Sequence, residues 1–261
     1  MALLLALVAV PGLAIGSFLN VVIHRVPLDR SLVRPGSRCP RCDTAIRPWH
    51  NVPVLSWLLL RGRCATCREP ISVRYPLVEL ATAMLFVAVT ARIGFTPALP
   101  AYLYLSAAAV ALTMIDFDVR RLPDAIVLPS YAVAAVLLVP PALTTADWHQ
   151  AIRAAAAMAV LWAFYFAIFW VYPGGMGFGD VKLAGLLGLY LGWLGWSAVV
   201  VGTFTGFLLG AVVGAVLLAA GRAGRRTHLP FGPWMLTGAL LALFVAQPVA
   251  DWYTSLLNPL A

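Results

Sequence analysis

The chain has 261 residues, of which 62% are hydrophobic and only 11% are charged, and its mean hydropathy is +0.91. This composition excludes an ordinary soluble globular domain and indicates a membrane protein. The formal net charge of +8 does not predict a nucleic-acid partner, because the chain carries no recognisable base-reading module.

Apolar segments of about 20 residues recur along the chain, and each is long enough to cross roughly 30 Å of hydrocarbon. The sixth of them is short and contains glycine. No basic residue precedes the first segment, so we expect a retained helix rather than a cleaved signal peptide. The sequence thus predicts an all-α polytopic membrane protein of about eight transmembrane helices, at Ala2–Ile23, Leu77–Gly94, Ala98–Ile115, Ala125–Leu143, Ala151–Tyr172, Val181–Leu194, Ser197–Ala220 and Pro233–Trp252.

The basic residues gather on one side of this predicted bundle, and only Arg92 and Arg153 lie near the opposite ends of the segments. Ten arginines lie between the first two segments, and Arg120, Arg121 and Lys182 lie near later segment ends on the same side. The positive-inside rule then places the first loop in the cytoplasm and the N-terminus outside. With eight spans the C-terminus is outside too. The lipid bilayer is the expected surrounding, and the basic loop could also attract anionic head groups.

All four cysteines lie in this first loop, as two Cys-x-x-Cys pairs separated by 21 residues. The spacing approximates that of a zinc ribbon, in which each pair grips one face of a tetrahedral ion. Disulfides are disfavoured in the reducing cytoplasm, and a redox dithiol would need a thioredoxin-like unit. We therefore predict a structural Zn²⁺ held in a zinc-ribbon-like cytoplasmic loop by Cys39, Cys42, Cys64 and Cys67.

Two aspartates stand at the edges of apolar segments, Asp116 in Met114–Asp118 and Asp180 in Gly175–Asp180. A carboxylate near hydrocarbon is costly and usually functional. Both fall on the predicted cytoplasmic side, so they could form a pair in which one acid holds a proton and the other activates water. The competing interpretation is two solvated interfacial charges. Gly177 and Gly179 favour the site interpretation, because glycine lets a substrate backbone approach closely.

Taken together and in order, several segments resemble bacterial type IV prepilin peptidases. The resemblance covers most of the chain, and its motifs are specific in combination. They are Gly16–Arg25, the two cysteine pairs, Asn51–Trp57, Arg61–Cys64, Arg74–Glu79, Asp116–Asp124, Gly175–Leu183 and Leu229–Pro233.

The resemblance implies an aspartic protease of the Gly-x-Gly-Asp kind in the bacterial inner membrane. Such an enzyme cleaves the basic leader of prepilins or pseudopilins after a glycine, on the cytoplasmic side, with Asp116 and Asp180 as catalytic residues and Gly177 and Gly179 against the substrate. Relatives that keep the four cysteines also methylate the new N-terminus with S-adenosylmethionine. The implied divisions are a first transmembrane helix (1–23), a methyltransferase-associated cysteine loop (24–76) and a membrane-embedded protease domain (77–261).

Three other functions remain open from the residues. One is a different intramembrane Gly-x-Gly-Asp protease, of the presenilin or preflagellin type, although those lack the paired cysteine loop. The second is a non-enzymatic zinc-ribbon scaffold of a secretion system. The third is a transporter that uses Asp116 and Asp180 as a proton relay.

Overall fold

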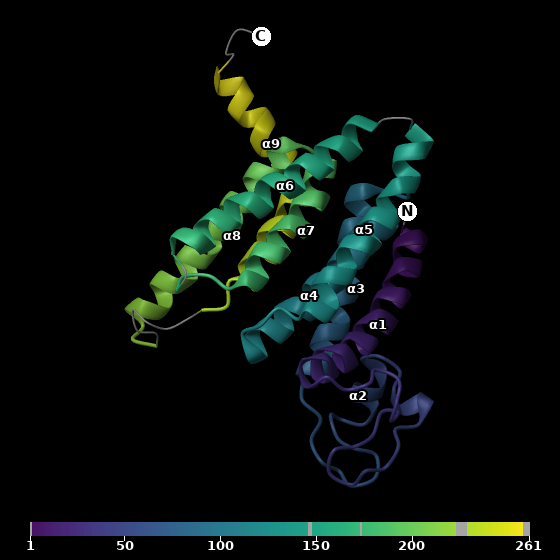
Figure 1. Ribbon diagram of the computed structural model, residues 1–261. Helices are drawn as coiled ribbons and strands as arrows, with labels where there is room; N and C mark the ends of the chain where they lie inside the picture. Colours follow the sequence, from purple (N-terminus) through teal and green to yellow (C-terminus); the bar gives the residue numbers. More distant parts are fainter. Residues whose placement is uncertain (1, 146–147, 173, 223–228, 258–261) are drawn as a thin grey trace. The chain divides into compact units, whose positions relative to one another are not determined.

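The computed structural model consists of helices and connecting loops (Figure 1) and describes residues 2–145, 148–172, 174–222 and 229–257. Within these residues no strand forms, and extended pairing is limited to two isolated bridges, Arg38 with Ala45 and Arg63 with Pro70. The 3-10 turns Val26–Leu28 and Pro48–His50 and the short helix α2 (Leu55–Leu59) lie between α1 and α3. The long helices are α1 (Ala2–Arg25), α3 (Arg74–Ile93), α4 (Leu99–Val119), α5 (Asp124–Thr145), α6 (Trp148–Val171), α7 (Phe178–Leu194), α8 (Trp196–Ala219) and α9 (Gly232–Leu257).

Each apolar segment predicted from the sequence is one of these long helices. Seven of the described helices are long and apolar enough to cross a membrane, which confirms an all-α polytopic membrane protein. The eighth, α7, has 17 residues. At 1.5 Å per residue it extends about 25 Å, near the lower limit for a span.

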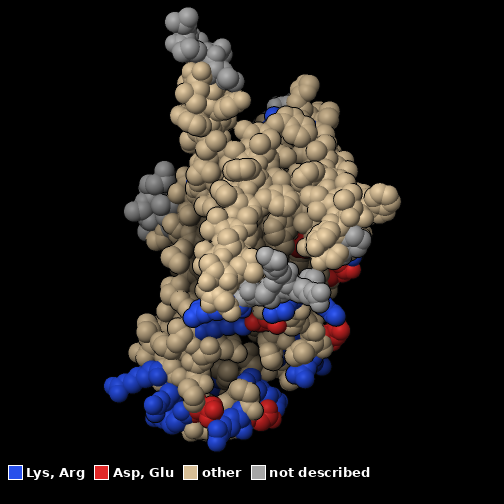
Figure 2. All heavy atoms as spheres, turned by 90° about the vertical axis from the view of Figure 1, so that its left-hand side faces the viewer, with Lys and Arg blue, Asp and Glu red and all other residues tan. Residues whose placement is uncertain are grey.

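The chain divides into two compact units, of which the first comprises residues 1–95 and 103–111. Here α1 packs along α3, and the cysteine loop joins their ends (Figure 1). The two helices approach closely at glycine, since a Cβ built on Gly16 would lie 2.6 Å from the Cα of Glu79. Charged side chains gather in two groups, one over the cysteine loop and one in a band at helix ends, whereas most of the remaining helical surface is free of charge (Figure 2). This division between a charged loop and apolar helices is the one expected of a loop outside the bilayer.

The second unit comprises residues 96–102 and 112–261 and is built around α7, which contacts α5, α6, α8 and α9. Twelve of the seventeen residues of α7 are buried. Its C-terminal carbonyls are satisfied by the guanidinium of Arg153, which donates to the backbone oxygens of Gly192 at 2.7 Å and Trp193 at 2.8 Å. A cation at this end also complements the helix dipole. The short helix can therefore end inside the protein rather than in water.

The helices α8 and α9 form the second closely packed pair of this unit. A Cβ on Gly238 would lie 2.6 Å from the backbone oxygen of Gly202, so the two backbones touch where neither residue has a side chain. Small residues at such a crossing favour helix association in lipid. Gly202 and Gly238 thus serve packing within the chain.

Candidate functional site

Asp116 and Asp180 lie in the same compact unit, in the last turns of α4 and the first turn of α7. Their residues are only 4% and 8% exposed, and the two carboxyl groups are close enough to interact electrostatically. The alternative of two solvated interfacial charges does not agree with this burial. The structure therefore brings together the two acids that the sequence singled out.

Asp180 is oriented by its own helix. The backbone N–H of Gly177 donates to Oδ2 of Asp180 at 3.1 Å, and Gly177 is the N-cap residue of α7. An acid in the first turn satisfies an otherwise free N–H and complements the positive end of the helix dipole. The ring of Tyr165 on α6 also lies within electrostatic range of Asp180. These contacts hold one carboxyl group of the pair in place.

Asp116 has a different environment. Within the part of the chain that the structure describes, its Oδ2 is buried and has no hydrogen-bond partner. Buried polar atoms are nearly always hydrogen-bonded, so an unpaired carboxyl oxygen marks a position that a water molecule or a substrate group can complete. The first residue of α9, Gly232, approaches this oxygen so closely that a Cβ there would lie 2.7 Å away.

Leu122, in the turn between α4 and α5, lies beside both Gly179 and Gly232. A Cβ on Gly179 would meet the Cβ of Leu122 at 3.2 Å, and one on Gly232 would meet its Cδ2 at 3.1 Å. Gly179 therefore allows close packing of α7 on this turn. By contrast, a Cβ on Gly177 would have only Asp180 and Gly179 within 4 Å. Of the two glycines predicted to face substrate, Gly177 has the more open surroundings.

An ion pair joins the turn at the start of α5 to α7. Nζ of Lys182 lies 2.7 Å from Oδ2 of Asp124, and the hydroxyl of Tyr131 donates to the backbone oxygen of Lys182. Sequence reasoning missed this pair, and also Gly232 and Tyr165, because each of these residues lies 49 or more residues from one of the two aspartates. Asp124, Lys182 and Gly232 lie within the motifs that carry the resemblance, but the motifs did not indicate which residues these three approach.

The four cysteines come together in the first unit. Their sulfur atoms all lie within 4.8 Å of one another, none is in a disulfide, and the Sγ atoms of Cys39 and Cys67 are 3.7 Å apart. Four sulfurs at 2.3 Å from a tetrahedral Zn²⁺ are separated by about 3.8 Å. The cluster therefore has the dimensions of a closed four-sulfur metal site.

The two cysteine pairs have the same backbone design. The N–H of Cys39 donates to the oxygen of Thr44 at 3.0 Å, and the N–H of Cys64 donates to the oxygen of Glu69 at 2.8 Å. After each pair, the next residue has a positive φ, 52° at Asp43 and 60° at Arg68. Each pair is thus a tight turn that points two sulfurs to one side. Arg41 and Glu69 connect the two turns through an ion pair of 2.9 Å.

The thiols hold their protons unequally. Hydrogen bonding with Thr44 lowers the pKa of Cys42 to about 6, and hydrogen bonding with the backbone of Cys67 lowers the pKa of Cys64. At Cys67 the N–H of Glu69 acts to lower the pKa, but burial and the neighbouring thiols raise it to about 12. Because thiolates repel one another, the last proton leaves with difficulty unless a cation sits among them. The donor set thus fits a divalent metal.

Two models of known families match the chain. The bacterial peptidase A24 N-terminal domain matches residues 10–93, and the type IV leader peptidase family matches residues 103–219. No solved structure matches. A prepilin leader peptidase/N-methyltransferase from Stutzerimonas stutzeri is 36% identical over 268 residues, 93% of this chain and 91% of that protein. Proteins of the same description from Pseudomonas aeruginosa and Aeromonas hydrophila are 35% and 38% identical, over 93% and 95% of this chain and 90% and 93% of theirs. Since it shares this much identity with relatives over nearly their whole length, the chain belongs to the type IV leader peptidase family.

Proposed function

We propose that the chain is a membrane-embedded aspartic endopeptidase that cleaves the leader from type IV prepilins or pseudopilins and then methylates the new N-terminal residue. The observation that carries the protease assignment is the pair of buried carboxyl groups of Asp116 and Asp180, one with an unpartnered oxygen. The relatives at 35–38% identity carry both activities in their description.

In the proposed reaction Asp116 and Asp180 share one proton and hold a water molecule between them. The ionised carboxylate removes a proton from this water as it attacks the scissile carbonyl, and the protonated acid donates a hydrogen bond to the developing oxyanion. A proton then passes to the leaving amine. Two like charges at close range cannot both ionise freely, which is why such a pair alternates between acid and base. The pair titrates as a unit, so neither aspartate alone is assigned the proton.

The substrate path follows from the charge distribution. We infer that the arginine-rich loop lies in the cytoplasm, with both aspartates on that side of the inner membrane and both termini outside. A prepilin would dock laterally, with its apolar helix among the spans and its leader in the cytoplasm, and cleavage would follow a glycine. Gly177, the more open of the two glycines, supports an extended substrate backbone beside Asp180.

The cysteine cluster supports a structural Zn²⁺ held by Cys39, Cys42, Cys64 and Cys67. Four sulfurs close the coordination shell, so the ion would organise the loop rather than take part in either reaction. Methylation would use S-adenosylmethionine, which supplies an electrophilic methyl group to the new amine.

The test is cleavage of a synthetic prepilin N-terminal segment by the purified full chain, followed by mass spectrometry. Asp116→Asn and Asp180→Asn should each reduce the cleavage rate by at least about 100-fold, because general acid–base groups typically contribute that much or more. Asp251→Asn, at an exposed position of α9, is the matched control and should cleave normally. If both site variants cleave near the wild-type rate, the assignment of this pair fails. If the wild type itself does not cleave the segment, a non-enzymatic scaffold becomes the better description.

A further inference from the structure

A cavity of about 470 Å³ lies in the first unit, between the end of α1, the cysteine loop and the start of α3. Asn20 comes from α1, Trp57 and Cys64 from the loop, and Tyr75 and Glu79 from the start of α3. Small-molecule sites in proteins typically have volumes of about 300–1,000 Å³. The cavity is therefore large enough for a nucleoside-sized ligand.

The walls of this cavity are fixed by hydrogen bonds and packing among the residues that line it and their neighbours. The Nε1 of Trp57 donates to the backbone oxygen of Ile71 at 3.0 Å, and Gly62 packs so closely that a Cβ there would lie 2.9 Å from the ring. The Nδ2 of Asn20 donates to the oxygen of Tyr75 at 3.2 Å. A site whose side chains are already held loses little conformational entropy when a ligand binds.

The polar groups of the cavity carry both signs of charge. Glu79 is 7% exposed and accepts the backbone N–H of Val54 at 2.7 Å, which fixes its carboxylate at the wall. Arg38 also lines the cavity and pairs with Asp43 at 3.0 Å. A buried carboxylate favours a cationic ligand group, and a guanidinium favours a carboxylate.

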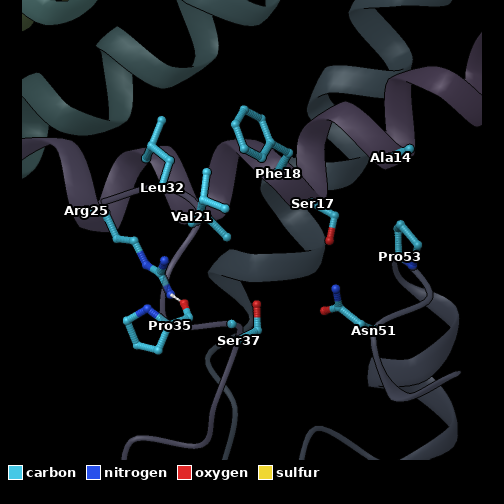
Figure 3. A pocket seen from close by; sticks show the side chains of 12 residues that line it. Ala14, Ser17, Phe18, Val21, Arg25, Leu32, Pro35, Ser37, Asn51 and Pro53 are labelled. Atoms are coloured by element: carbon cyan, nitrogen blue, oxygen red, sulfur yellow. Dashed lines mark hydrogen bonds between the residues drawn. The ribbon is translucent and has the colours of Figure 1, made fainter. Parts of the chain in front are cut away.

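A second groove of about 440 Å³ adjoins the cavity, and Figure 3 shows the residues that line this groove. Ser17, Val21 and Asn51 line both hollows, as do Arg25 and Ser37, so the two meet at these residues, and we infer that the passage between them lies there. Figure 3 shows Phe18 and Leu32 on the apolar side of the groove, with the guanidinium of Arg25 turned to the backbone oxygen of Pro35 at one end. The groove thus connects an apolar face of α1 to a polar interior.

We propose that the cavity binds the methyl donor S-adenosylmethionine and that the adjoining groove admits the amine to be methylated. This inference rests on the methylation included in the proposed function and gives that activity a location. The donor combines a flat adenine, a sulfonium cation and an amino-acid zwitterion. The cavity offers aromatic surface at Trp57, an anion at Glu79 and a cation at Arg38.

The groove suits the substrate that accepts the methyl group, which is the new N-terminal amine followed by an apolar helix. Such a substrate needs an apolar surface for the helix and polar groups beside the amine. In the transfer, the amine lone pair forms the N–C bond while the S–C bond breaks, its electrons stay on sulfur as a thioether, and an ammonium proton passes to solvent. The groove residues Phe18 and Leu32 would hold the apolar segment, and Ser17 and Asn51 at the passage would face the amine.

The cysteine cluster forms part of the wall of the same cavity. Cys39 and Cys64, one from each pair, line it. Any cation that holds the four sulfurs together therefore also holds that wall in place. Binding of the metal would then affect binding of the donor by fixing the shape of the cavity, although the metal and the donor would not touch.

The experiment measures donor binding directly, with the full chain in lipid nanodiscs. Isothermal titration with S-adenosylhomocysteine compares wild type with Glu79→Gln, which removes the charge, and Ser17→Leu, which fills the passage. Ala6→Leu adds similar bulk to an exposed position of α1 away from both cavities and serves as the control. We expect at least tenfold weaker binding for both site variants and unchanged binding for the control. Zinc content and melting temperature check that each variant is folded.

A second measurement uses only the wild-type chain. Ultraviolet crosslinking of radiolabelled S-adenosylmethionine, followed by peptide mapping, should label residues between 14 and 79. Labelling confined to the second unit, or binding within twofold of wild type in both site variants, would overturn the location. If the wild type cleaves prepilin but neither binds donor nor methylates, the methylation itself is refuted and the location with it. Methylation by a wild type whose label maps elsewhere refutes the location alone.

Discussion

Gly232, the first residue of α9, makes room for the carboxyl group of Asp116. In Gly232→Ala the new Cβ would lie 2.7 Å from Oδ2 of Asp116 and 3.1 Å from Cδ2 of Leu122. Carbon contacts normally begin near 3.5 Å, so the carboxyl group or the start of α9 must move by roughly 0.8 Å. A displacement of about 1 Å at reacting groups can cost about 100-fold in rate. We therefore expect cleavage to slow by roughly 10- to 100-fold, equivalent to about 1.4–2.7 kcal/mol of activation free energy.

Stability should change much less than activity. Rotating one carboxyl group off its preferred angle costs about 0.5–1.5 kcal/mol, and alanine recovers part of this as a better helix former. The assay compares initial cleavage rates and melting temperatures of Gly232→Ala with those of Gly214→Ala. A Cβ on Gly214 would make only an ordinary contact, at 3.6 Å from Leu229. A Gly232→Ala protein that cleaves within twofold of wild type would refute the idea that this glycine positions Asp116.

Three further outcomes follow from the same geometry. Reduced, freshly purified protein should hold one zinc per chain, and Cys39→Ser should lose it and expose the loop to protease; elemental analysis that finds no zinc would rule out the metal site. Asp180→Asn should still methylate a precleaved pilin segment, because the acids and the cysteine loop lie in different units; failure despite native folding, zinc and donor binding would mean that both reactions share one site. Gly238→Ala should lower the melting temperature through a loss of about 1–3 kcal/mol, since its Cβ would lie 2.6 Å from the oxygen of Gly202; an unchanged melting temperature would contradict the packing argument.

Hydropathy was sufficient to predict the helices, because each span must satisfy its own backbone in lipid. The predicted segment Ala151–Tyr172 is α6 (Trp148–Val171), and Val181–Leu194 is α7 (Phe178–Leu194). Hydropathy could not show that α7 is enclosed by four other helices. For the same reason hydropathy could not show that Trp193 is buried, with only 7% of its surface exposed. Burial within a bundle and exposure to lipid both select apolar side chains.

The site was predictable in part. Charge within apolar sequence identified Asp116 and Asp180, and spacing identified the four cysteines. The contacts that hold them involve backbone, which carries no side-chain signal. Gly177 donates its N–H to Asp180, and Gly232 approaches Asp116 closely because it has no side chain. Such backbone contacts can be identified only from the folded structure.

The close approach of α1 to α3 bears on the order in which the protein is assembled. A Cβ on Gly12 would lie 2.7 Å from the Cα of Ala83, so this helix pair is held by its own packing and needs no help from the loop. Packing of the pair brings the ends of the intervening loop together and removes much of the entropy cost of closing it. We therefore expect the helices to enter the membrane before the cysteines acquire an ion. Chains that enter the membrane without the metal would then already have this helix pair in place, and later binding of a metal would complete only the loop.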